Sequence, residues 1–251
     1  MATKHAIGID IGGTGIKGAI VDLETGALVT ERRKVLTPDG GKPDDIVKAT
    51  AELLDTIGAD GDIDGLALGV CFPAIVKRGH TLSAANVSKK WIGLHAEELF
   101  EKALGRDIHF INDADAAGIA ELRFGAAAGV DGLVILTTLG TGIGSAFLYD
   151  GVLIPNTELG HLELDDDDAE HRAAYSAMER EELSWKQWAE RLQRYYAHVE
   201  FIFSPDLLVV GGGVSKHQEH FLPLLDLKTP IVPAVHRNNA GIIGAAALAL
   251  G

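Results

Sequence analysis

The sequence predicts an α/β protein of two similar lobes, each built on a mixed β-sheet. Two observations lead to this fold class. The chain opens with a β-β-β-α-β order of apolar runs and one amphipathic segment, which is typical of α/β domains. A hairpin around a glycine-threonine turn then recurs in the second half of the chain. We therefore expect an internal duplication, with a cleft between the two lobes.

The first half supplies the clearer element pattern. Residues 6–11 and 18–21 are expected to form a hairpin around a Gly-Gly-Thr-Gly turn, whose glycines allow unusual backbone angles. A third strand is expected over 28–35. Residues 44–57 carry apolar side chains at helical spacing after Pro43-Asp44, which predicts a helix, and the apolar run 65–70 predicts a fourth strand.

The second half repeats this order. Strands are expected over 132–138 and 145–149, and Thr141-Gly142-Ile143 matches Thr14-Gly15-Ile16. A charged helical stretch over 169–203, a buried strand over 206–210, a Gly211-Gly212-Gly213 turn and a C-terminal helix are predicted next. The acidic run 165–168 is interpreted as a solvated loop, because adjacent carboxylates point in different directions and repel one another.

Composition excludes several classes of function. The chain has 251 residues, is 47% hydrophobic and carries a formal net charge of -14, which opposes binding to nucleic acid or an anionic membrane. Its single cysteine, Cys71, excludes an internal disulfide and a cysteine-based zinc site. No apolar stretch is long enough to span a bilayer. We expect a cytoplasmic protein with no nucleic-acid or membrane partner.

Two turns have the composition of phosphate-binding loops. The first places the carboxylate of Asp10 at a strand end, then small residues whose N–H groups can approach a phosphate, then the cation of Lys17. It lacks the ending of a Walker A loop, and a plain tight hairpin remains an alternative explanation. The predicted donor-binding residues are Asp10, Gly12, Gly13, Thr14, Gly15, Lys17, Thr138, Gly140, Thr141 and Gly142.

Asn112-Asp113 follows a predicted strand over 109–111 and opens a predicted helix that runs to residue 124. This spacing puts Asp113 at a helix N-terminus. An N-cap is the alternative explanation for an aspartate at that point.

These motifs, together with Glu158-Leu159-Gly160-His161 and Gly211 to Ser215, resemble the ROK family of sugar kinases and repressors in their order along nearly the whole chain. The resemblance implies ribonuclease H-like lobes of the actin and hexokinase superfold. We expect a smaller lobe over 1–112 with 236–251 and a larger lobe over 113–235. A repressor is disfavoured, because no helix-turn-helix precedes the first strand.

The resemblance also implies roles for individual residues. Asp113 would be the general base on the sugar 6-hydroxyl. Asp10 would act with Mg²⁺ on the donor phosphates, and Gly212 would lie near the donor. Glu170, with Glu179 as the fallback, would be a further sugar ligand from the region where typical members carry a zinc motif. The implied glucose-binding residues are Asn86, Asn112, Asp113, Glu158, His161 and Glu170.

The missing zinc motif and the segment 84–93 make the chain similar to the branch of this family that contains polyphosphate glucokinases and glucomannokinases. Polyphosphate offers neither base nor ribose, so cations and amides must bind it. Lys89 and Lys90, with Lys77 and Arg78, could line its path, although solvated loop charge is the alternative. Trp91 is expected to pack.

The resulting hypothesis is a homodimeric, polyphosphate-dependent glucokinase that uses Mg²⁺ and accepts inorganic polyphosphate, with ATP as a further donor. The alternatives are an ATP-dependent glucokinase or glucomannokinase, and a sugar-sensing ROK protein that binds glucose without turning it over. An intact Asp113 argues against the sensor.

Overall fold

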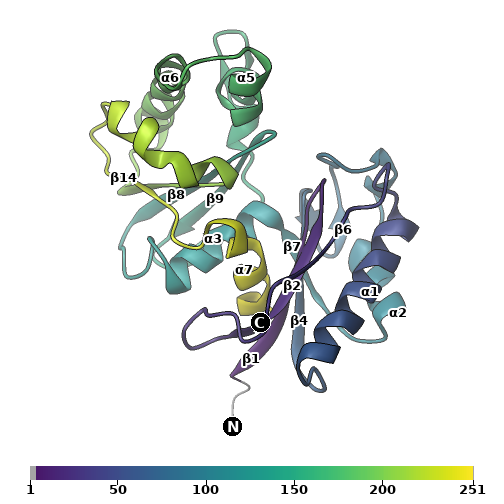
Figure 1. The fold of residues 1–251 in the computed structure, drawn as a ribbon. Helices are drawn as coiled ribbons and strands as arrows, with labels where there is room; N and C mark the ends of the chain where they lie inside the picture. The colour runs from purple at the N-terminus through teal and green to yellow at the C-terminus, as the bar shows by residue number, and fades with distance from the viewer. Residues whose placement is uncertain (1–3, 251) are drawn as a thin grey trace. The chain divides into compact units, whose positions relative to one another are not determined.

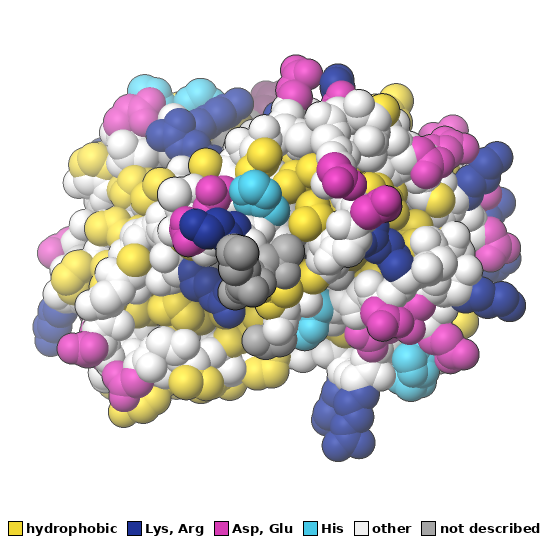
Figure 2. Space-filling model, turned by 90° about the horizontal axis from the view of Figure 1, so that it is seen from below, with side chains coloured by type: hydrophobic (Ala, Val, Ile, Leu, Met, Phe, Trp, Pro, Cys, Tyr) yellow, Lys and Arg dark blue, Asp and Glu magenta, His cyan; other side chains and the backbone are white. Residues whose placement is uncertain are grey.

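The computed structural model describes residues 4–250, and Figure 1 shows its elements. The chain divides into two compact units. Unit 1 comprises the residues up to Ala120 together with those from Asn239 onward, and unit 2 comprises Glu121–Asn238. Among the described residues, no helix is both long and apolar enough to cross a membrane. Acidic and basic side chains are interspersed on the face drawn in Figure 2.

Unit 1 is built on a five-stranded mixed sheet in the order β3-β2-β1-β4-β7. Strands β1, β4 and β7 are parallel, while β2 is antiparallel to both β1 and β3. The carboxyl ends of the parallel strands therefore meet at one edge, where α/β proteins place their ligand sites. The strands are β1 (His5–Ile11), β2 (Ile16–Asp22), β3 (Arg33–Val35), β4 (Ala67–Phe72) and β7 (His109–Asn112).

Helices cover both faces of this sheet because side chains alternate along each strand. Ile7, Ile9 and Ile11 of β1 join a core cluster with residues of α1 (Pro43–Asp60) and α2 (Ala96–Leu104). The intervening Gly8 faces α7 (Ala240–Leu248) so closely that a Cβ there would collide with the backbone of that helix. Figure 1 shows α1 and α7 on opposite sides of the strands.

Unit 2 repeats this topology in the order β10-β9-β8-β13-β14, with the same parallel and antiparallel pairs. The helix α6 (Trp185–Phe203) leads from β10 toward β13, as α1 leads from β3 to β4. A Ser184–Gln187 capping box starts α6. The expected duplication and mixed sheets are confirmed. The strands are β8 (Leu133–Leu139), β9 (Ile143–Tyr149), β10 (Val152–Ile154), β13 (Leu207–Gly211) and β14 (Ile231–Pro233).

An insertion between β10 and α6 differs from the expectation. The acidic run 165–168 is the two-residue loop and the second strand of a short hairpin, in which β11 (Glu163–Leu164) pairs with β12 (Asp167–Asp168), whereas a loop alone was expected. The helical stretch after it is broken into α4 (Ala169–Ala173), α5 (Tyr175–Arg180) and α6, because Ala174 is extended and Ser184 starts a new helix. The carboxylates of Asp165, Asp167 and Asp168 are 40–47% exposed, in line with the expected solvation, and each also pairs with a basic side chain.

The unit boundary lies inside α3 (Asp113–Phe124), beyond the expected division at residue 112. The first turns of α3 pack against α7, where Gly244 approaches the backbone of Ala116 so closely that a Cβ could not fit. Glu121 instead accepts hydrogen bonds from the backbone N–H groups of Val235 and His236, at 3.0 and 2.8 Å. These contacts explain why the division falls between Ala120 and Glu121.

The strand expected over 28–35 is also shorter than predicted. Only Arg33–Val35 joins the sheet, and Leu28 makes an isolated bridge to Val21. The Ile20 N–H donates to the hydroxyl of Thr30 at 3.0 Å, so a side chain takes the place of a backbone carbonyl in the ladder.

Candidate functional site

The first glycine turn, Gly12 to Gly15, joins β1 to β2. The N–H of Gly12 donates to the carbonyl of Gly15 at 3.0 Å, and the hydroxyl of Thr37 donates to the carbonyl of Gly12. A free carbonyl oxygen would repel an anion, so its capture by Thr37 suits the turn to a phosphate. Asp10 is the next-to-last residue of β1, and its carboxylate lies 3.2 Å from the Nζ of Lys17.

Two further side chains lie against this turn. A Cβ on Gly13 would stand 2.8 Å from the Cβ of Asn86, so the structure brings Asn86 next to the turn. The β2–β3 register pairs Lys17 with Lys34, and the stem of Lys34 crosses Gly15. Sequence reasoning missed both Lys34 and Thr37. Lys34 could be found from the hairpin register, because cross-strand partners face the same side.

The ends of β4 and β7 carry the other functional residues of unit 1. Asn112 caps α3: its Oδ1 accepts from the N–H groups of Ala114 and Asp115 at 2.8 and 3.0 Å, and its Nδ2 donates to Ala74 at 3.0 Å. The cap is thus Asn112, and Asp113 is the first helical residue. Its carboxylate is half-buried and accepts the N–H of Ala114 at 2.9 Å.

The thiol of Cys71 lies at this edge, 3.7 Å from the Oδ1 of Asp10. Cys71 is the register partner of Asp10 on β1 and of Ile111 on β7. Burial raises the pKa of its thiol well above the ordinary value, and the negative charges of Asp10 and Asp113 raise it further. Asp10 and Asp113 are therefore close enough to act electrostatically on the same atom.

The lysines of the expected donor path are anchored but exposed. Lys89 and Lys90 lie in a 3₁₀ turn capped by the hydroxyl of Ser88. The turn is fixed by Trp91, which is fully buried as expected and donates to the carbonyl of Gly41 at 2.9 Å. Lys77 and Arg78 are also exposed, in the separate hairpin of β5 (Val76–Lys77) and β6 (His80–Thr81).

The second glycine turn, in unit 2, follows the same design with one residue fewer. Ile16 pairs with Ile11 across a four-residue turn, and Ile143 pairs with Leu139 across three residues. Ser176 of α5 takes up the turn's carbonyl groups: its N–H donates to Gly140 at 3.0 Å and its hydroxyl to Thr141 at 2.6 Å. Sequence reasoning missed Ser176, which has no motif around it.

Gly212 belongs with this second turn. Its φ is 82°, in the left-handed region that favours glycine, and a Cβ there would overlap the backbone of Leu139. The predicted donor residues Thr138, Gly140, Thr141, Gly142 and Gly212 thus form one group in unit 2.

The expected sugar ligands of unit 2 also lie together. Glu170 of α4 accepts from the N–H of Ile143 at 3.0 Å, and its carboxylate lies against Gly160 and Gly142. Burial raises the pKa of Glu158, the charge of His161 lowers it, and the charge of Glu170 raises it. The fallback, Glu179, is exposed on α5. The geometry therefore groups Glu158 and His161 with Glu170.

His161 is oriented by a carboxylate that the sequence did not identify. Its Nδ1 lies 2.9 Å from Asp168 at the end of the acidic hairpin. This hydrogen bond raises the pKa of the imidazole, against a smaller lowering by burial, and the charge of Glu170 adds to the rise. A histidine held through one ring nitrogen presents the other to a ligand.

The candidate site residues form two sets, one in each unit. Unit 1 supplies Asp10, Asn86, Asn112, Asp113 and the first turn. Unit 2 supplies the second turn, Gly212 and the group of Glu158, His161 and Glu170. The first set combines carboxylates, a cation and a phosphate-compatible turn, which suits phosphoryl transfer. The second adds hydrogen-bonding groups that suit a polyol.

Comparisons with known proteins agree with this chemistry. The profile of the ROK family matches residues 6–172. A polyphosphate glucokinase of Mycobacterium tuberculosis is 46% identical over 97% of this chain and 90% of its own. The crystal structure of an inorganic polyphosphate/ATP-glucomannokinase from Arthrobacter sp. strain KM shares 53% identity and a TM-score of 0.96, over 99% of both chains. The chain belongs to the ROK family.

A more distant structure agrees at the level of the fold. A ROK family glucokinase from Streptomyces griseus is 24% identical, with a TM-score of 0.81 over 97% of this chain and 98% of its own. Together with the two five-stranded mixed sheets, this confirms the expected fold class.

The Asp168–His161 pair gives a prediction about pH. Asp168→Asn should lower the pKa of His161 toward its ordinary value of 6.5, because the hydrogen bond to a carboxylate is the main cause of the rise. The folded pKa is above the unfolded one, so the pair stabilises the fold fully below about pH 6.5 and loses this effect as pH rises through the raised value. An NMR titration of the imidazole measures the shift.

Asp167→Asn is the matched control. Asp167 pairs with His171 at 2.8 Å and raises the pKa of that imidazole instead. The control should move His171 and leave His161 in place. An unchanged His161 titration in Asp168→Asn would contradict the assignment.

Proposed function

We propose that the protein is a polyphosphate glucokinase, which transfers a phosphoryl group from inorganic polyphosphate to the 6-hydroxyl of glucose. The observation that carries the proposal is the position of Asp113. It is a half-buried carboxylate at the start of a helix, fixed by the Asn112 cap beside Asp10 and the first glycine turn. The 46% identity to a named polyphosphate glucokinase supports both donor and acceptor.

Asp113 acts as the general base on the 6-hydroxyl. Phosphoryl transfer depends mainly on positioning and charge stabilisation, so the base contributes about 10²- to 10⁴-fold to the rate. Asn112 has a second role beside sugar binding: the hydrogen bonds of its Oδ1 fix the first turn of α3. One N–H of its amide donates to Ala74, and the other is assigned to a sugar hydroxyl.

The remaining hydroxyls of glucose are assigned to Asn86, Glu158, His161 and Glu170. Carboxylates accept hydrogen bonds from sugar hydroxyls, and the second ring nitrogen of His161 offers a further partner. Asn86 adds an amide beside the first turn, with a φ of 59° that asparagine tolerates better than most residues. We assign the role of the further sugar-binding glutamate to Glu170, and not to Glu179, which was the alternative from the sequence.

ROK sugar kinases generally need a divalent metal, and we assign Mg²⁺ to Asp10. The residue fits the ion: Mg²⁺ prefers oxygen ligands, keeps several waters and uses one or two carboxylates together with substrate phosphates. The Asp10 carboxylate is 16% exposed, and Lys17 pairs with only one of its oxygens. The bound ion would neutralise charge on the donor phosphates, while Lys17 and Lys34 supply protein cations at the same turn.

The donor is assigned to the two glycine turns, to Gly212 and to the exposed Lys89 and Lys90. Inorganic polyphosphate is bound through charge and amide groups alone, and these residues supply both kinds. ATP is the second candidate donor, because the Arthrobacter relative is named for polyphosphate and ATP together. A sugar sensor without turnover is disfavoured by the intact Asp113 and its cap.

The buried, single Cys71 fits the reducing cytoplasm that we infer as the location. We also infer a homodimer. Large apolar side chains are exposed on unit 2, with Val152 of the edge strand β10 at 66% and Phe201 of α6 at 82%. A second copy that covers them would remove an exposed strand edge and its apolar neighbours from water.

The central prediction concerns Asp113. Purified protein with glucose and Mg²⁺ should form glucose 6-phosphate from polyphosphate, and Asp113→Asn should reduce turnover about 10²- to 10⁴-fold while calorimetric glucose affinity stays nearly unchanged. The substitution keeps the size of the side chain and removes the base. Comparable or higher rates with ATP alone would refute the polyphosphate preference. Glucose binding without product from either donor would favour the sensor.

A second prediction concerns the donor path. Lys89→Ala with Lys90→Ala should raise the KM for polyphosphate, more steeply as salt increases, and leave the KM for ATP nearly unchanged. The control removes two exposed lysines elsewhere in unit 1, through Lys48→Ala and Lys102→Ala. Equal changes in KM for the two donors, or equal changes in the two double variants, would show that Lys89 and Lys90 do not bind polyphosphate.

The dimer is tested by light scattering. The protein should have twice the 26.6-kDa mass of the chain. Val152→Glu with Phe201→Glu should give the monomer mass, because charges replace the exposed apolar contacts. A monomeric parent protein would contradict the dimer, and a dimeric double variant would place the interface elsewhere.

A further inference from the structure

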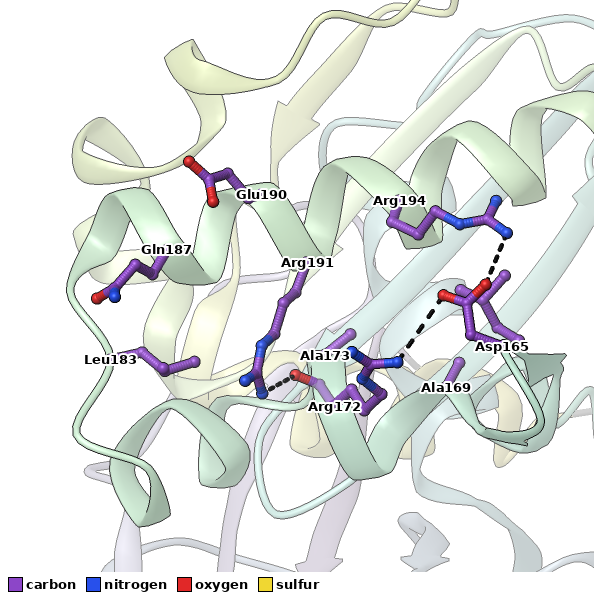
Figure 3. A pocket seen from close by; sticks show the side chains of 10 residues that line it. Asp165, Ala169, Arg172, Ala173, Leu183, Gln187, Glu190, Arg191 and Arg194 are labelled. Carbon is purple, nitrogen blue, oxygen red and sulfur yellow. Dashed lines mark hydrogen bonds and ion pairs between the residues drawn. The ribbon is translucent and has the colours of Figure 1, made fainter.

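A pocket of about 360 Å³ lies in unit 2 between α4, α6 and the tip of the acidic hairpin (Figure 3). Its volume is at the lower end of the range for small-molecule sites. Arg172 lines it from α4, two positions after Glu170, and side chains two positions apart on a helix point to nearly opposite sides. The pocket therefore lies behind the sugar-ligand group and is distinct from it.

The pocket gathers three guanidinium groups in a protein whose net charge is strongly negative. Arg191 and Arg194 are three residues apart on α6 and share one helix face. Arg191 also donates to the carbonyl of Arg172 at 3.2 Å, which links α6 to α4. Asp165 and Glu190 are the acidic residues of the lining, and Figure 3 shows Glu190 pointing away from Asp165.

Asp165 places its carboxylate between two of these arginines. Its Oδ1 lies 2.9 Å from Arg194, and its Oδ2 lies 3.9 Å from Arg172. All three side chains are about half exposed, with relative exposures of 44% for Asp165, 54% for Arg172 and 55% for Arg194. Ion pairs with this exposure are weak, so another anion could displace the carboxylate.

The hairpin tip holds Asp165 in front of this pocket. Asp165 and Asp166 are the two loop residues between β11 and β12, and both have positive φ, at 57° and 63°. Two-residue hairpin turns of this kind favour asparagine, aspartate or glycine at the first position and glycine at the second, so Asp165 suits its place in the turn.

We propose that this pocket binds a phosphate-class oxyanion between Arg172 and Arg194, and that Asp165 is its internal competitor. Guanidinium groups bind phosphate through paired hydrogen bonds, and a phosphate carries more charge than a single carboxylate. The ligand could be free orthophosphate or one group of a phosphate chain. The inference goes beyond the glucokinase proposal and does not require that the protein be a kinase.

The experiment uses calorimetry on the full chain without glucose, with orthophosphate and tripolyphosphate as separate probes. Asp165→Asn should bind more tightly than the parent, by about tenfold, because it removes the competing charge and leaves both arginines. Asparagine tolerates positive φ better, so the turn should persist. Arg172→Gln with Arg194→Gln should remove the component of binding that Asp165→Asn strengthens, while binding at the proposed donor turns should remain. Thermal unfolding without ligand checks that each variant folds.

Asp167→Asn is the matched control, since it removes the same charge from the same hairpin but pairs with His171, outside the pocket lining. It should bind like the parent. Binding of orthophosphate alone would identify a site for the free ion, and much tighter binding of tripolyphosphate would identify a chain segment. Equal affinities of Asp165→Asn and Asp167→Asn, or a gain from Asp165→Asn that persists when both arginines are also replaced in a folded variant, would overturn the proposal.

Discussion

The position of Asp113 depends on the side chain of Asn112. The amide is buried and makes three hydrogen bonds, two to the first turn of α3 and one to the loop after β4. It therefore fixes the helix start against two parallel strands. Loss of one buried partner typically costs about 1–3 kcal/mol, so any residue without this amide would loosen the helix start that carries Asp113. Because the side chain of Asp113 is short, the position of its carboxylate depends on how firmly the first turn of α3 is held.

The parallel register of β1, β4 and β7 places Asp10 and Cys71 at the sheet edge where Asn112 and Asp113 lie. Because β1, β4 and β7 run together, Asp10, Cys71 and Ile111 are cross-strand neighbours, and Asn112 and Asp113 follow directly. The close approach of α7 supports this edge: Gly241 lies against the Asp10 carboxylate, where a Cβ would be 2.9 Å from its Cγ. A small residue is thus required opposite Asp10, and the C-terminal helix α7 supports this edge of the sheet through packing.

In both units, a hydroxyl group binds a carbonyl oxygen of the glycine turn, but the two hydroxyls come from different side chains. Each glycine turn has carbonyl oxygens that would repel phosphate, and each has a hydroxyl from a later segment that captures one of them. Thr37 does so after β3, and Ser176 does so from α5. The duplication could be predicted from the recurring Thr-Gly-Ile, and the strand order followed. The hydroxyls of Thr37 and Ser176 could not be predicted in these roles, because their positions depend on loop paths that no local sequence pattern encodes. The Asp168–His161 pair could not be predicted for the same reason.

The acidic hairpin shows most clearly why the rest escaped prediction. Adjacent carboxylates were expected to point in different directions, and three of them meet a basic side chain: Asp165 meets Arg172 and Arg194, Asp167 meets His171, and Asp168 meets His161. These partners come from η2 (Leu159–His161), α4 and α6. With a single cysteine, the chain cannot form a cysteine-rich metal site in this region. The ion pairs of the hairpin instead connect it to η2, α4 and α6. Charge on the hairpin thus orients the imidazole of His161 on one side and lies between two arginines of the pocket on the other.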